Sequence, residues 1–187
     1  MTVSAEHFET FDLNLQLHLR YCRAEDVPKL EWGGMFSMDA YIIEKSFLRH
    51  LAGKNIMLVC EANNFPIAQV WIDLERHAAD GAGFIWALRV LPGLRRLGIG
   101  TRLVAAAEAL IAEHGFACAE ISVETHNVRA RQLYERLGYQ QIGDDGDPPV
   151  EWSPEPEHLQ PPHIIMRKQL TPGAECRIEN VTGVQTH

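Results

Sequence analysis

The sequence predicts a single α/β domain in which helices cover both faces of a mixed, mostly antiparallel β-sheet. Strand-like and helix-like segments alternate along the chain, and an early pair of strand-like runs has the form of an antiparallel hairpin. The 187 residues are 46% hydrophobic and 22% charged, proportions that are usual for a globular chain of one domain. We expect residues 1–170 to form this domain and residues 171–187 to be a C-terminal tail.

The first half of the chain begins with a strand near residues 17–22. Acidic residues and an early proline at 25–28 favour the start of a helix. Apolar side chains recur every three or four positions over residues 39–51, which indicates an amphipathic helix. A strand and two helices are therefore expected before the hairpin.

The hairpin consists of the β-rich runs 56–60 and 67–72, which are separated by the turn-forming residues 63–66. Residues 84–91 are almost wholly apolar, so we expect a central strand that is covered on both faces.

The second half repeats the alternation. Helical spacing over residues 100–114 is followed by a strand at 119–124 and by a second helix over 127–138. Residues 139–142 and 163–168 are predicted to be closing strands.

The charge balance excludes some partners. The chain has 25 acidic residues against 17 Lys and Arg, a formal net charge of −8, so a nucleic-acid backbone would be repelled. The proline-rich residues 144–162 contain six acids and no Lys or Arg. Such a segment could draw in a cationic amine or could be a solvated loop, and both interpretations stay open.

Targeting and metal signals are missing from the sequence. The first twenty residues lack the basic start and apolar run of a secretory signal, and no run is long enough to span a membrane. The four cysteines form no CxxC pair and have no histidine at zinc-finger spacing. We therefore expect a cytoplasmic protein without a membrane contact or a metal site.

The most informative segment is the loop over residues 95–101, between the predicted central strand and a helix. Backbone N–H groups at a helix N-terminus, together with the helix dipole, bind anions. Gly98 and Gly100 would allow close approach of phosphate oxygens, and Arg95 and Arg96 would add positive charge at the rim. A pyrophosphate would suit this loop.

Two common phosphate-binding loops do not fit the same residues. A P-loop requires Gly-Lys-Ser/Thr, but Gly100 is followed by Thr101 and Arg102. The dinucleotide fingerprint requires a third small residue where this chain has Leu103.

What remains is the pattern R-x-x-G-x-G at residues 95–100, which resembles the acetyl-CoA signature of the GNAT superfamily of N-acetyltransferases. A second match supports it, because residues 127–139 resemble that family's segment N-x-x-A-x-x-L-Y-E-x-x-G-F/Y. The resemblance implies a splay between the fourth and fifth strands, here residues 84–91 and 119–124, which holds the pantetheine arm of acetyl-CoA. The residues implied to bind the cofactor are Leu88, Val90, Arg95, Arg96, Leu97, Gly98, Ile99, Gly100, Thr101, Asn127 and Ala130.

Acetyl transfer to an amine needs a neutral nucleophile and a proton for the departing CoA sulfur. The resemblance implies that Tyr134 is the general acid. It also implies a glutamate early in the fourth strand of some relatives, where this chain has Phe84. Glu124 is our candidate base; the alternatives are Asp73, Glu75 and His126, deprotonation through water, and capture of an amine that is already neutral.

The resemblance leaves two functions open. One is acetyl transfer to a small-molecule or peptide amine by direct attack, and the other is noncatalytic acetyl-CoA binding or sensing on the same fold. The acceptor, the acyl-chain preference and the oligomeric state, for which a homodimer is one option, are not encoded in these motifs.

Overall fold

The computed structural model describes residues 14–35, 40–144 and 162–171. They form a seven-stranded sheet with the order β1-β2-β3-β4-β5-β7-β6, in which β4 and β5 are the parallel pair and the other neighbours are antiparallel. The strands are β1 (His18–Tyr21), β2 (Asn55–Ala62), β3 (Phe65–Asp73), β4 (Ala82–Val90), β5 (Cys118–Glu124), β6 (Gln140–Asp144) and β7 (His163–Gln169).

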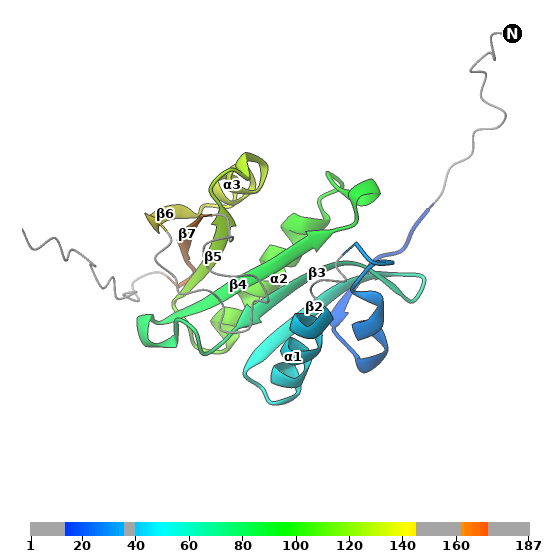
Figure 1. Ribbon diagram of the computed structural model, residues 1–187. Helices are drawn as coiled ribbons and strands as arrows, with labels where there is room; N and C mark the ends of the chain where they lie inside the picture. Colours follow the sequence, from blue (N-terminus) through cyan, green and yellow to red (C-terminus); the bar gives the residue numbers. More distant parts are fainter. Residues whose placement is uncertain (1–13, 36–39, 145–161, 172–187) are drawn as a thin grey trace, which may run out of the picture.

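The helices lie on both faces of this sheet (Figure 1). Helix α1 (Ala40–Leu51) and the 3-10 helix η1 (Ala24–Lys29) lie on one side, and α2 (Ile99–Glu113) and α3 (Val128–Arg136) lie on the other. Two further 3-10 turns, η3 (Ala78–Asp80) and η4 (Pro92–Leu94), precede and follow β4. The fold class predicted from the sequence is therefore confirmed.

Strand β2 explains why the sheet has two cores. Successive side chains of a strand point to opposite faces. Accordingly Leu58 packs into the larger core under α2 and α3, whereas Met57 and Val59 pack into the smaller core under α1. All three side chains are at most 5% exposed, which is why this strand has no polar face.

The predicted helix after residue 25 is shorter than expected. It is the six-residue 3-10 helix η1, and Pro28 lies inside it. Proline lacks the amide hydrogen that an α-helix needs. Positive φ angles at Trp32, Gly33 and Gly34 then turn the chain toward α1.

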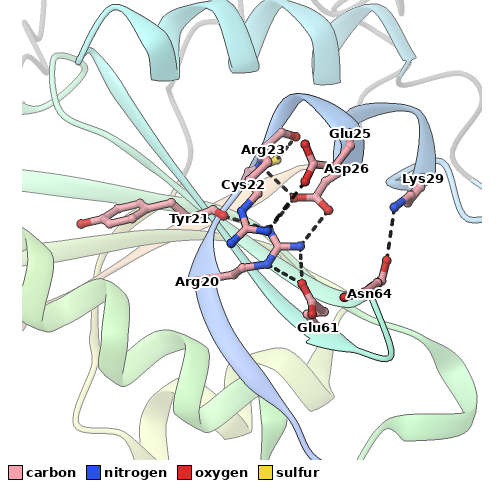
Figure 2. Close-up of polar contacts among 9 residues, drawn as sticks. All are labelled: Arg20, Tyr21, Cys22, Arg23, Glu25, Asp26, Lys29, Glu61 and Asn64. Atoms are coloured by element: carbon pink, nitrogen blue, oxygen red, sulfur yellow. Dashed lines mark hydrogen bonds and ion pairs between the residues drawn. The ribbon is translucent and has the colours of Figure 1, made fainter.

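An ion cluster fastens η1 to the first two strands. Figure 2 shows the guanidinium of Arg20 between the carboxylates of Asp26 and Glu61. Arg20 donates to both carboxylate oxygens of Asp26, at 2.6 and 2.9 Å, and the amide of Arg23 donates to Asp26 at 2.8 Å. Asp26 is fully buried. The cluster holds the N-terminal strand and η1 together as one unit.

Part of the sequence-based prediction lies outside the described residues. The acidic segment over 144–162 falls almost wholly there, as does the tail beyond residue 171. The proposed division at residue 170 and the role of the acidic segment stay predictions.

Candidate functional site

Strands β4 and β5 pair over only half of their length. Their parallel register runs from Ala82 opposite Cys118 to Ile85 opposite Ile121 and ends there. Beyond this point β4 stays paired with β3, and β5 stays paired with β7. The two strands therefore separate, as Figure 1 shows, and the splay implied by the resemblance is present. We call the point at Ile85 and Ile121 the apex of the splay.

A β-bulge in β4 lies next to the apex. The register shifts so that Ala87 and Leu88 together oppose Val70 of β3, and Ala87 has a φ of 50°. A bulge places two consecutive side chains on one face of a sheet. Accordingly Trp86 and Ala87 both contact the core under α1, whereas Leu88 and Val90 pack toward α2 and α3.

The loop that follows β4 has the features of an anion site. Arg96 has a φ of 69° and Gly98 a φ of 80°, and α2 begins directly after Gly98. The amide of Arg102 donates to the Gly98 carbonyl oxygen at 3.1 Å and closes the first turn. Three amides precede Arg102 in this turn, those of Ile99, Gly100 and Thr101. They have no helix carbonyl oxygen one turn earlier to which they could donate. These donors and the positive end of α2 face the same region.

The side chains of this loop have different surroundings. Arg95, Arg96, Leu97 and Thr101 are exposed, and Arg95 Nε donates to the Val90 carbonyl oxygen at 3.0 Å. Ile99, in contrast, is buried in the core under α2. Ile99 can therefore contribute to anion binding only through its amide, while the arginines lie where they can add charge.

Gly100 marks the place where β4, α2 and α3 meet. A Cβ atom there would lie 3.9 Å from Leu133 Cδ2 and 4.0 Å from Leu88 Cδ2 and Val90 Cγ2. The structure thus brings together three predicted cofactor residues, Leu88, Val90 and Gly100. Those distances are ordinary van der Waals contacts, so the folded chain itself does not require glycine here.

Helix α3 presents the second motif to the same core. Asn127 is its N-cap, and the side-chain Oδ1 accepts a hydrogen bond from the Ala130 amide at 3.1 Å. Ala130 is partly buried against the larger core. One turn further, Tyr134 is 5% exposed, and its ring centroid is 6.0 Å from that of Tyr139. Burial raises the pKa of the Tyr134 phenol well above its ordinary value, so the hydroxyl keeps its proton.

The sequence-predicted base candidates are scattered. Glu124 ends β5 beyond the apex, is 42% exposed and pairs with His126 Nε2 at 3.0 Å. Asp73 accepts from Arg49 at 2.9 Å and from the amides of Glu75 and Arg76. These contacts hold the start of the β3–β4 loop. Within the described part of the chain, the ion-pair partners of these carboxylates are His126 and Arg49, and neither carboxylate contacts Tyr134.

One buried carboxylate near the apex was missed in the sequence. Glu120 of β5 is 1% exposed and interacts with His77 and Arg167. The available signal was weak, because Glu120 alternates with apolar residues in the predicted strand just as Ser122 and Glu124 do, a pattern that is typical of an exposed strand face. Its partners, however, come from segments 43 and 47 residues away, which no local pattern indicates.

The described residues contain neither a group of metal ligands nor a helix that could cross a membrane. Over residues 14–35, 40–144 and 162–171, no three His, Cys, Asp or Glu side chains are grouped so that they could hold a metal ion. In the same ranges no helix has the length and apolar character needed to cross a membrane.

Comparison with known proteins gives one family. Residues 21–139 match the model of the "Acetyltransferase (GNAT) family". A curated Bacillus subtilis relative, the uncharacterized N-acetyltransferase YhfO, is 41% identical over 54 residues. That match covers 29% of this chain and only 36% of the relative.

Solved structures share the fold over most of the chain. The PaiA N-acetyltransferase of Thermoplasma acidophilum, in complex with coenzyme A, has a TM-score of 0.63 at 17% identity, covering 82% of this chain and 99% of that one. YncA of Salmonella typhimurium, a putative acetyltransferase with acetyl-CoA, has a TM-score of 0.65 at 15% identity, covering 86% and 98%. At these identities the structural likeness is evidence for the fold alone.

Proposed function

Because this chain belongs to the GNAT acetyltransferase family, we propose that it transfers the acetyl group of acetyl-CoA to a primary amine by direct attack. The family expected from the two motifs is confirmed by the family match. The name of the N-acetyltransferase relative supports the expected enzyme class, an acetyl-CoA-dependent acetyltransferase. The reaction, the acceptor and the roles of individual residues are our proposal.

The observation that carries the proposal is the junction at Gly100. It places the open amides of α2 beside the separated part of β4. Phosphates of coenzyme A would bind the amides and the rim arginines, Arg95 and Arg96. The pantetheine arm would run along the edge of β4 that β5 has left, past Val90 and Leu88. Its thioester would then lie near the apex.

The length of β4 is consistent with this arrangement. From Val90 to Ile85 the strand spans four residue steps of its partner β3, because the bulge takes up one residue, and this is about 13 Å at the usual rise of a strand. This separation leaves room for an extended arm between the phosphate loop and the apex. The solved relatives that hold coenzyme A or acetyl-CoA support the choice of cofactor.

Tyr134 is the proposed general acid. It belongs to the same core as Ile85 and Ile121 at the apex, and its burial keeps the phenol neutral. A neutral phenol can donate a proton to the CoA sulfur as the carbon–sulfur bond breaks. Glu124 stays a candidate base at the end of β5, and the acceptor is proposed to be a small-molecule or peptide amine.

The test combines binding with turnover. Coenzyme A should raise the melting temperature, because a ligand that binds only the folded state stabilises it. Acetyl-CoA mixed with a panel of small amines and peptide N-termini should release thiol at a rate that depends on one class of amine. A melting shift without thiol release would instead indicate the noncatalytic acetyl-CoA binding protein. If coenzyme A produces no melting shift and no amine causes thiol release, both functions are refuted.

A further inference from the structure

A histidine–carboxylate pair lies beside the apex on the face opposite α2. Glu120 of β5 is opposite Phe84 of β4, one step before the last paired residues, Ile85 and Ile121. Alternate residues of β5, Ala119, Ile121 and Val123, point into the core under α2 and α3. Glu120 therefore points to the other face of the sheet. If the phosphates of coenzyme A bind at α2, this is the face from which the acceptor amine would reach the thioester.

The Glu120 carboxylate has side-chain partners from two other segments of the chain, His77 and Arg167. His77, from the loop after β3, contacts Glu120 Oε2 through its Nδ1 atom. Arg167 of β7 donates from Nε to the other carboxylate oxygen, Oε1, at 2.6 Å. The imidazole also packs on Phe84, with ring centroids 4.9 Å apart. Glu120 is thus held on one side by a permanent cation and on the other by a titratable ring.

The surrounding charges define the protonation state of the carboxylate. Burial alone would raise the pKa of Glu120, but the hydrogen bonds and charges of His77 and Arg167 outweigh burial and lower it. Arg76, whose guanidinium lies 4.2 Å from the Phe84 ring centroid, is a further charged group near the pair. Glu120 is therefore ionised at neutral pH.

An ionised carboxylate fixes the tautomer of its partner. A carboxylate only accepts hydrogen bonds, so His77 Nδ1 must carry the hydrogen. In the neutral ring the lone pair is then on Nε2, the nitrogen that takes up a proton. A buried carboxylate that orients an imidazole in this way is the arrangement found behind general-base histidines.

We propose that His77 is the proton acceptor for the amine and that Glu120 is its positioning residue. The assignment rests on the proposed acetyl transfer. Phe84 cannot accept a proton, and His77, which packs against the Phe84 ring, would supply the base in its place. The side chain of His77 is 15% exposed, so the ring can return its proton to solvent.

The proton balance is complete with the groups named. The ammonium of the acceptor gives a proton to His77 Nε2, and the nitrogen lone pair forms the bond to the acetyl carbon. The carbon–sulfur bond then breaks, and sulfur takes the proton of Tyr134. The new amide nitrogen gives up its extra proton, which restores the phenol through water. His77 releases one proton to solvent, and the products are an N-acetyl amine and free CoA thiol.

The decisive variant is His77→Asn, because the amide nitrogen of asparagine can still donate to Glu120 while the side chain cannot take up a proton. We expect kcat/KM for the amine to fall about 10²- to 10⁴-fold. The decline in rate at acidic pH should disappear, and the melting shift with coenzyme A should remain. His114→Asn is the matched control, since His114 also uses Nδ1, toward the Leu110 carbonyl at the end of α2, and should keep the wild-type profile.

Two further variants separate catalysis from packing. Glu120→Gln keeps an acceptor for Nδ1 but removes the negative charge beside the ring. The fall in reaction rate at acidic pH should therefore occur at a lower pH than in the wild type. His77→Ala opens a space beside Phe84, and added imidazole should restore part of its activity. A purely structural ion cluster would show neither effect.

The outcomes distinguish this assignment from the proposed function. If the wild type is active and His77→Asn keeps its rate and pH profile, the assignment is wrong and the acetyl transfer stands. The assignment is also wrong if Glu124→Gln, rather than His77→Asn, abolishes the acidic decline. A wild type that releases no thiol with any amine refutes the proposed function and this assignment together.

Discussion

The side-chain Oδ1 of Asn127 accepts the hydrogen bond of the Ala130 amide at 3.1 Å, so the asparagine caps the helix that carries Tyr134. The family resemblance implies that the same side chain contacts the cofactor. The two roles use different atoms, because capping occupies the oxygen and leaves the amide nitrogen to donate. Substitution can therefore separate them.

We predict that Asn127→Ala lowers the free energy of unfolding by about 1 kcal/mol, the usual cost of losing an N-cap. Asn127→Asp should keep the cap and the stability, since aspartate is an equally good capping residue. It should nevertheless weaken coenzyme A binding, because it replaces an amide donor by a negative charge. Calorimetric titration with coenzyme A and urea unfolding give the two readouts. Equal affinity in wild type and Asn127→Asp would limit Asn127 to capping.

Gly100→Ala tests the approach of the cofactor to α2. A Cβ at this position meets its nearest neighbours at 3.9 to 4.0 Å, so the chain should tolerate it and could gain up to about 1 kcal/mol of helix propensity. The melting shift with coenzyme A should shrink, since the added methyl would lie where phosphate oxygens approach the amides. An undiminished shift would show that no ligand comes close to Gly100.

Gly83→Ala is the opposite control. Its Cβ would lie 2.7 Å from Ile111 Cγ1 in the core, so overpacking should cost about 1–3 kcal/mol of stability. Coenzyme A should still bind the folded fraction with normal affinity, because Gly83 lies in the paired part of β4.

Local signals explain why the loop and the two helices of the candidate site could be predicted. Glycine at residue 98 predicts a backbone that other residues rarely adopt, and its φ is 80°. The three- and four-residue spacing of apolar side chains similarly predicted the ends of α2 to within one residue and those of α3 to within two.

Features made by pairing between distant segments could not be predicted from the residues alone. Nothing about Ala87 indicates that it adopts a positive φ, because alanine rarely does so. Strict alternation would have put Trp86, Leu88 and Val90 on one face, and the bulge separates them. The His77–Glu120 pair likewise exists only because the loop after β3 folds back over β4 and β5.

Tyr134→Phe should lower turnover by roughly ten- to ten-thousand-fold, the range for loss of a general acid, with little change in coenzyme A affinity. Tyr139→Phe, in the neighbouring ring, should keep normal turnover. Because burial raises the pKa of Tyr134, the phenol should stay a donor past pH about 10, the ordinary tyrosine value. Full activity of Tyr134→Phe in the thiol-release assay would make this tyrosine a core residue only.

The last prediction concerns acid stability and the Arg20–Asp26 contact in Figure 2. Burial by itself raises the pKa of Asp26, but the hydrogen bonds from Arg20 and from the Arg23 amide outweigh it, and the folded-state pKa is lowered. A lowered folded-state pKa means that the contribution to stability is complete above the unfolded value, about 3.9, and is lost as pH falls through the folded value.

Asp26→Asn should therefore cost roughly 3 kcal/mol at neutral pH, the lower end for breaking a buried ion pair, because Glu61 still compensates Arg20. The difference from wild type should narrow below pH about 4 as Asp26 becomes protonated. Urea unfolding at neutral and acidic pH measures both values, with Glu25→Gln as control, because Glu25 is exposed and contacts Arg23 only at 3.7 Å. A destabilisation that is the same at both pH values would mean that Asp26 acts through packing and not through its charge.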